Sequence, residues 1–469
     1  MHSCVLPWFV MKIVYTYILL KKISRRRGGV AGKGVMKAMR NLLLGAVLAA
    51  TMMTGAQAAV EPKSVVKTYA DVALAGYEDA LSTARDLQKS VNALLAGPSA
   101  KTLAAARDAW LAARVPYQQT EAFRFGNPIV DDWEGRVNAW PLDEGMIDYV
   151  DASYGTESDA NAYYVVNVIA NKKLSVGGKA VDASTITPEL LRDVLHEADG
   201  NEANVSTGYH AIEFLLWGQD LNGTGPAPAG RGGTPMERHA GNRPHTDFDP
   251  ANCTGGHCER RGQYLQVVTD LLVSDLEEMV GNWKADGEAR QAVQEDPKAG
   301  LIAMLTGLGS LSYGELAGER IKLGLMLHDP EEEHDCFSDN THNSHFYNQV
   351  GMMNVYLGRY ARVDGSTVKG AALSDLVKGV DAGLDAEMRA KLDDTLKAMQ
   401  AMKDRAEKTE TYDQMIAQGN TAGNAVVQAV IDGLVAQTRS IERVIAALEL
   451  GGIELEGSDS LDNPNAVFK

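Results

Sequence analysis

Two side chains that can bind a metal, His210 and Glu213, lie three residues apart in the otherwise apolar segment GYHAIEFLLWG. Residues three apart share one face of an α-helix, so an imidazole nitrogen and a carboxylate oxygen would point toward one place. One histidine with several carboxylates suits a hard or borderline cation, and we expect iron rather than zinc. Two ligands do not complete a metal site. A buried histidine that only hydrogen-bonds a neighbouring carboxylate is the alternative interpretation.

The elements around this motif are predicted to be helices. From Val66 to Leu94, apolar residues recur in steps of four and three, which indicates one buried stripe of a long helix that ends at Gly97. A second apolar stripe follows and, continued at the same spacing, reaches Glu121 and Arg124. These two charges therefore fall on a buried face. They need partners there, because an unpaired buried charge costs several kcal/mol.

The later half of the chain repeats this plan. One apolar stripe runs from Leu265 to Trp283, and a helix that begins after Pro297 extends to Glu315 and Arg320. Alternating β-branched residues occur only in brief patches that a helix would accommodate equally well. We therefore predict an all-α fold of two antiparallel four-helix-bundle-like domains, related by duplication.

Composition shifts divide the chain into five parts. In chain order they are a presequence (1–58), an N-terminal helical domain that carries the His-x-x-Glu motif (59–221), an irregular linker (222–253), a C-terminal helical bundle (254–455) and a tail (456–469). The linker is rich in Gly and Pro, and a segment of this length is either a functional loop or a tether. We interpret it as a tether along the surface.

The presequence contains a secretory signal. Met36 opens a basic start, which is followed by an apolar run at 42–53 and a small-residue exit at 56–58. We take Met36 as the true start, and a membrane anchor in residues 1–35 is the alternative. The apolar run is too short to span a bilayer, and no cysteine follows it to receive a lipid. We expect a periplasmic or secreted protein with no lipid anchor and no transmembrane segment in its mature form.

Charge and cysteine use agree with export. The chain carries 45 Lys/Arg against 62 Asp/Glu, a formal net charge of −17, which disfavours nucleic acid as a partner and favours cations. Cys253 and Cys258 in NCTGGHC are predicted to form a disulfide, with a Cys/His metal knuckle that uses His257 as the alternative. Cys336 is then left over.

A second group of potential ligands is crowded into HDPEEEHDCFSDNTHNSHF, residues 328–346. It contains four histidines and several acids: His328, His334, His342 and His345 with Glu331, Glu332, Glu333, Asp335 and Asp339. This density is typical of a secondary metal site, but a solvated acidic loop fits equally well. Ordering such a loop around an ion would cost entropy.

Several motifs taken together resemble the imelysin family, which includes iron-regulated periplasmic proteins and is also classed as a metallopeptidase family. They are GYHAIEFLLWG for the Gly-x-His-x-x-Glu signature, WLAARVPYQQTEAFRFG, NAWPLDEGMIDY, HTDFDPANC and GELAGERIKLGLMLHDPEEEHDCFSDNT. The resemblance implies an exported all-α protein associated with iron or haem acquisition, with a metal site at the signature. Carried onto this sequence, His210 and Glu213 would be ligands. Glu121 would be a third ligand and Asp143 a weaker addition, while Arg124 would orient Glu121.

These patterns predict a metal-binding component of iron uptake, which receives a metal ion or haem and works with an iron-uptake membrane protein. A zinc peptidase at the same site is the first alternative. It would need three protein ligands, an open position for water and a general base, and the His-Glu-x-x-His helix is absent from this sequence. A docking scaffold in which His210 and Glu213 form only a structural pair is the second alternative.

Overall fold

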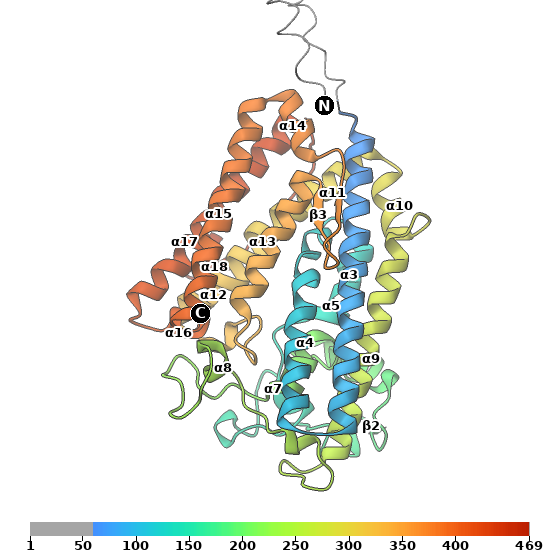
Figure 1. The fold of residues 1–469 in the computed structure, drawn as a ribbon, viewed down its shortest axis with the longest axis vertical. Helices are drawn as coiled ribbons and strands as arrows, with labels where there is room; N and C mark the ends of the chain where they lie inside the picture. The colour runs from blue at the N-terminus through green and yellow to red at the C-terminus, as the bar shows by residue number, and fades with distance from the viewer. Residues whose placement is uncertain (1–59, 469) are drawn as a thin grey trace, which may run out of the picture. The chain divides into compact units, whose positions relative to one another are not determined.

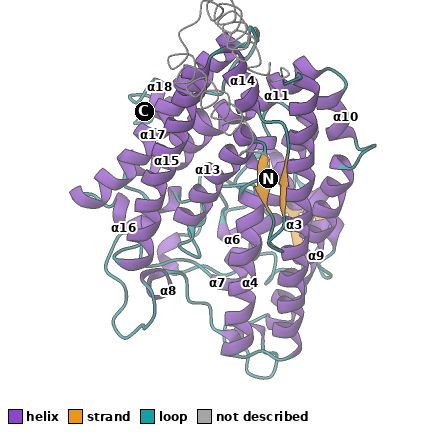
Figure 2. Cartoon of the chain, turned by 45° about the horizontal axis from the view of Figure 1, so that its top comes forward, coloured by secondary structure: helices purple, strands orange, loops and turns teal. Residues whose placement is uncertain are grey.

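The computed structural model describes residues 60–468, so the presequence with its proposed start at Met36 lies outside the described residues. Helices dominate this part of the chain, and its strands form two short antiparallel hairpins (Figure 2). The predicted helical class is therefore confirmed. Residues 60–468 form one compact unit, and the duplication of two bundles stays a prediction. None of the described helices combines the length and apolar character needed to cross a bilayer.

Two long helices, α3 (Pro62–Ala96) and α4 (Ala100–Gln118), begin the fold and pack against each other. Every apolar position of the predicted stripe from Val66 to Leu94 is buried, as the spacing requires. Ser99 and Thr102 form a capping box that starts α4 directly after the turn.

Helix α9 (Cys258–Trp283) completes this first group, although it lies within the predicted C-terminal bundle (254–455). It packs along α3 and against α7 (Gly208–Trp217), with the Trp283 ring stacked near Tyr77 and edge-on to Tyr69. The apolar stripe of α9 was recognised, but an apolar stripe does not specify which helix covers it.

A second group of helices contains α13 (Thr341–Leu357), α15 (Ala382–Lys408) and α17 (Thr421–Ala447). It also contains the run of α11 (Pro297–Ser310), the π-helical η6 (Leu311–Lys322) and α12 (Leu323–Leu327). Helix α13 packs on both α4 and α15, so it joins the two groups (Figure 1).

The remaining elements are short and connect these helices. They are η1 (Glu121–Phe123), α5 (Pro128–Asn138), α6 (Glu144–Ile147), η2 (Ala152–Tyr154), β1 (Lys173–Val176), β2 (Lys179–Asp182), η3 (Leu190–Leu195), η4 (Ala198–Gly200), α8 (Pro235–His239), η5 (His245–Phe248), α10 (Glu288–Gln294), η7 (Pro330–Glu332), β3 (Arg359–Ala361), β4 (Thr367–Lys369), α14 (Leu373–Val380), α16 (Tyr412–Ile416) and α18 (Asp459–Asp462).

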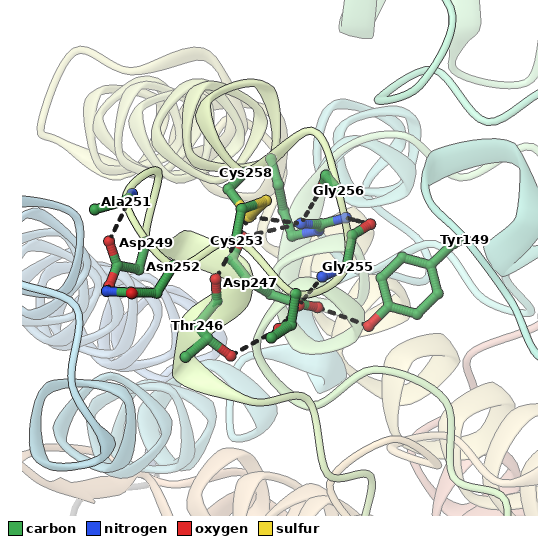
Figure 3. Close-up of a disulfide and its surroundings, with 12 residues drawn as sticks. Tyr149, Thr246, Asp247, Asp249, Ala251, Asn252, Cys253, Gly255, Gly256 and Cys258 are labelled. Atoms are coloured by element: carbon green, nitrogen blue, oxygen red, sulfur yellow. Dashed lines mark hydrogen bonds between the residues drawn. A yellow bond between two sulfur atoms is a disulfide. The ribbon is translucent and has the colours of Figure 1, made fainter.

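The segment 222–253 is not a tether along the surface. It carries α8 and η5, and the Arg243 guanidinium is buried and donates to Asp148 at 2.7 Å. At its end, Cys253 forms a disulfide with Cys258, and beside this disulfide Asp247 accepts a hydrogen bond from the Tyr149 hydroxyl at 2.6 Å (Figure 3). Interior ion pairs therefore fix this irregular segment to the helices.

Candidate metal centre

Helix α7 carries the His-x-x-Glu motif, and all ten of its residues are buried. Its first residue, Gly208, has a φ of 81°, and a Cβ atom there would lie 2.4 Å from the Val137 carbonyl oxygen. Only glycine fits this close approach of two backbones. The Trp110 indole donates a hydrogen bond of 2.9 Å to the Tyr209 carbonyl, which attaches α7 to α4.

His210 and Glu213 contact each other directly. Nδ1 of His210 lies 3.0 Å from Oε2 of Glu213, and Oε1 of Glu213 accepts from the backbone and the hydroxyl of Ser338 at 2.9 and 2.7 Å. Nε2 of His210 is buried and has no hydrogen-bond partner. Glu213 therefore holds the ring from behind, and the nitrogen available to a ligand is Nε2.

Two residues of the 328–346 segment converge on this ring. His210, His334 and Asp335 each offer one atom within 4.8 Å of the others, and we call these three residues the histidine centre. The His210 and His334 rings are perpendicular, with centroids 4.7 Å apart, and Nε2 of His334 also lacks a partner. All three side chains are at most 1% exposed, so a solvated loop is the wrong interpretation for this part of the segment.

Arg114, which no sequence motif singled out, compensates the charge of the histidine centre. It is buried and donates to Asp335 at 2.7 Å and to Asn138 at 2.6 Å. Burial raises the pKa of Asp335, but the Arg114 guanidinium outweighs it and holds that pKa well below the usual range. Because Arg114 lies four residues after Trp110, on the buried side of α4, helical spacing could have predicted that Arg114 is buried.

The imidazole of His210 is neutral in this environment. Burial, together with the nearby positive charge of Arg114, lowers the pKa of His210 to about 3. A neutral imidazole is the form that binds metals. Two unpartnered histidine nitrogens beside one carboxylate fit a transition-metal ion by donor type, and two histidines with one carboxylate are a known Fe(II) set.

Glu121, Arg124 and Asp143 do not join this centre. Glu121 is buried, as the stripe predicts, but it accepts from Arg320 at 2.9 Å. The chain leaves the α4 helix after Gln118, so helical phase does not carry Glu121 to the His210 side.

The other two predicted residues contact different partners. Arg124 pairs with Asp131 at 2.8 Å instead of orienting Glu121. Asp143 is partly exposed and accepts a hydrogen bond from Asn161. Among the described residues, the group that meets His210 contains neither Glu121 nor Asp143.

The family model for imelysin (peptidase M75) matches residues 73–441. The chain belongs to the imelysin family. Iron-regulated protein A from Synechococcus elongatus is 30% identical to this imelysin over 87 residues, which are 19% of this chain and 24% of that relative. The match thus spans about a quarter of the relative's length, and the regulation that its name states is a property of that protein.

Two solved structures share the fold of this imelysin. One, described as an iron-regulated protein A precursor from Parabacteroides distasonis, has a TM-score of 0.58 and 19% identity, covering 84% of this chain and 97% of the other. The second, an imelysin-like protein from Psychrobacter arcticum 273-4, has a TM-score of 0.51 and 14% identity, covering 84% and 98%. At these identities the likeness shows the fold alone.

Proposed function

We propose that this imelysin is an exported protein of iron acquisition, which binds a metal ion at the histidine centre and passes it to an iron-uptake membrane protein. The observation that carries the proposal is the pair of buried, unpartnered Nε2 atoms of His210 and His334 beside Asp335. A buried polar atom without a partner costs about 1–3 kcal/mol, and a bound cation would offset that cost. The name of the Synechococcus relative supports an iron-related role.

The burial of both rings favours a bare ion over haem as the cargo. A macrocycle needs an open cleft, whereas His210 and His334 are each 1% exposed. Two histidines with one carboxylate suit both Fe(II) and Zn(II) by donor type, and the name of the Synechococcus relative favours iron. Arg114 shares Asp335 with any bound cation, so we expect a moderate affinity that permits release.

Metal titration of the purified protein tests this proposal. Under anaerobic conditions, His210→Ala and His334→Ala should each remove one equivalent of bound Fe(II) relative to wild type. His257→Asn is the matched control, because His257 is an exposed histidine with a φ of 52° that asparagine accepts. Unchanged Fe(II) stoichiometry in both variants would refute the proposal.

Thermal unfolding separates metal binding from a purely structural pair. A cation that binds only the folded state raises the melting temperature. If His210 and Glu213 form only a structural pair, His210→Ala lowers the melting temperature equally with and without Fe(II).

A further inference from the structure

A second buried group of potential ligands lies apart from the histidine centre. It consists of Asp220, His239, Asp339 and Asp413, each of which offers one atom within 4.8 Å of the others, and we call it the acidic cluster. Nδ1 of His239 lies 3.0 Å from Asp413, 3.7 Å from Asp339 and 3.9 Å from Asp220. The Asp220 side chain is 10% exposed, and the other three are at most 1% exposed.

Four separate segments contribute these residues. Asp220 follows α7, His239 ends α8, Asp339 precedes α13 and Asp413 lies in α16. Two of the segments lie before residue 240 and two lie after residue 338. An ion bound here would therefore connect parts of the chain that are up to 193 residues apart in sequence.

Hydrogen bonds outside the cluster fix the direction of three of the four side chains. Nε2 of His239 donates to the Gly225 carbonyl at 2.9 Å, which leaves the Nδ1 lone pair toward the carboxylates. Oδ1 of Asp220 accepts hydrogen bonds from the backbone and the side-chain amide of Asn222. Oδ1 of Asp413 accepts one from the Thr411 hydroxyl. In both Asp220 and Asp413, Oδ2 is therefore the oxygen that faces His239. Such contacts behind the ligands are how proteins orient metal ligands.

The atoms that face inward have no hydrogen-bond partner. They are Nδ1 of His239, Oδ2 of Asp413 and both carboxylate oxygens of Asp339. Although Nδ1 lies 3.0 Å from Asp413, the two do not meet in hydrogen-bond geometry. Within residues 60–468, no lysine or arginine pairs with these three carboxylates, and their only ion-pair partner is His239. Carboxylates that lack a full countercharge in the protein interior must either hold a proton or bind a cation.

We propose that the acidic cluster is a second cation site, which takes a first-row transition-metal ion that prefers oxygen ligands, such as Fe(II) or Mn(II). Carboxylates supply the hard oxygen donors, and the imidazole selects a transition metal over Mg²⁺ or Ca²⁺. The site does not use His210, so it stands independently of the proposed function.

A small pocket lies beside the acidic cluster. Asp220 lines this pocket together with Glu144, Glu331 and Glu333, so the pocket and the cluster share one carboxylate. The pocket thus brings carboxyl groups of α6, of η7 and of the residue after η7 next to Asp220.

Asp339→Asn is the sharpest test, because both of its oxygens lack partners and its φ of 54° suits asparagine. The purified protein is titrated anaerobically with Fe(II), and then with Mn(II), Zn(II) and Mg(II). Wild type should bind two equivalents of Fe(II), whereas Asp339→Asn should bind one, or bind the second at least tenfold more weakly. Asp413→Asn is the second variant, and Asp286→Asn, at an exposed aspartate, is the control.

The double variant that combines Asp339→Asn with His210→Ala separates this inference from the proposed function. His210→Ala alone should retain one equivalent, and the double variant should retain none. If wild type binds one equivalent that Asp339→Asn removes and His210→Ala leaves, the acidic cluster stands and the histidine centre fails. If Asp339→Asn and Asp413→Asn keep the full stoichiometry and the full metal-induced rise in melting temperature, the cluster is a proton-sharing network and the inference is overturned.

Discussion

The histidine centre and the acidic cluster solve the same physical problem in two ways. Both bury acidic side chains of the 328–346 segment, Asp335 in one and Asp339 in the other. In the histidine centre a buried guanidinium, Arg114, neutralises the carboxylate. In the acidic cluster three carboxylates meet one imidazole. The negative charge of the histidine centre, which carries the family signature, is thus more fully neutralised than that of the acidic cluster.

This difference predicts different roles for a bound ion. A cation at the histidine centre competes with Arg114 for Asp335, which lowers its affinity. At the acidic cluster no guanidinium competes for the carboxylates, although a cation there must displace the protons that burial and the neighbouring acids favour on Asp220 and Asp339, whose pKa values are raised. We therefore expect the acidic cluster to bind more tightly and to stabilise the fold more.

The largest expected effect comes from removing the guanidinium. Arg114→Met leaves Asp335 as an uncompensated buried charge, so the free energy of unfolding of the metal-free protein should fall by about 3–5 kcal/mol. Fe(II) should restore more of that stability in the variant than it adds to wild type, because it no longer competes for Asp335. Urea unfolding with and without Fe(II) measures both quantities.

Arg85→Met is the matched control for this change. Its pair with Glu277 is exposed, so the loss should stay below about 1 kcal/mol. Equal losses in the two variants would mean that Arg114 does not compensate a buried charge.

The pH dependence of stability should differ between the two regions. The folded pKa of Asp220 is raised to about 6, mainly by burial and also by Asp413, from 3.8. The folded state therefore holds this proton more tightly, and the associated stability is complete below about pH 4 and lost as the pH rises through 6. Asp335, whose folded pKa is lowered, behaves oppositely: its stability is present above about pH 4 and lost as the pH falls.

Asp220→Asn isolates the part that the acidic cluster contributes. In chelator-treated protein it should flatten the decline in stability between pH 4 and pH 7 by up to about 3 kcal/mol. Chemical unfolding at several pH values measures this slope, with Asp286→Asn as the control. A decline that persists unchanged in Asp220→Asn would place its origin elsewhere.

Glu213→Gln should weaken metal binding at the histidine centre alone, by about 10–100-fold. The amide can still accept from Ser338, but it can donate to Nδ1 of His210 and so place the ring proton on Nε2, where the metal would bind. Competition titration with a chromogenic chelator measures the affinity of each site. An equal loss at the acidic cluster would show a general structural effect, and Glu319→Gln, at an exposed glutamate, is the control.

The smallest effect on metal binding is expected at Glu121. Glu121→Gln should leave the affinity of both sites within about twofold, while the loss of a charged partner for Arg320 lowers the free energy of unfolding by about 1–3 kcal/mol. Isothermal titration together with urea unfolding measures the two effects. A tenfold loss of metal affinity in Glu121→Gln would show that Glu121 is a metal ligand after all.

Local periodicity was sufficient to predict the long helices of this fold and their buried faces. The stripe from Val66 to Leu94 faces the core of α3, and that from Leu265 to Trp283 faces the core of α9, because a period of 3.6 residues places apolar side chains on one face. Periodicity did not show that α9 packs on α3, because an apolar face accepts any apolar partner.

The functional groups were predictable only in part. The spacing of His210 and Glu213 placed both on one face, and they contact each other in the structure. It did not show that Glu213 lies behind the ring, because that depends on Ser338, which is 125 residues away. His239 lay in a segment interpreted as a tether, since nothing in its local sequence indicates burial.

The sequence by itself determined the helical class and the His-x-x-Glu pair on one helix face, because both depend on spacing within a short stretch. It determined the membership of the imelysin family through several motifs taken together. Only the tertiary structure decided which charges meet. Arg114 reaches Asp335, Arg320 reaches Glu121, and His239 meets Asp413, because packing brings together segments that are distant in the chain. Burial then makes each of these encounters either a compensated pair or a site that needs a cation.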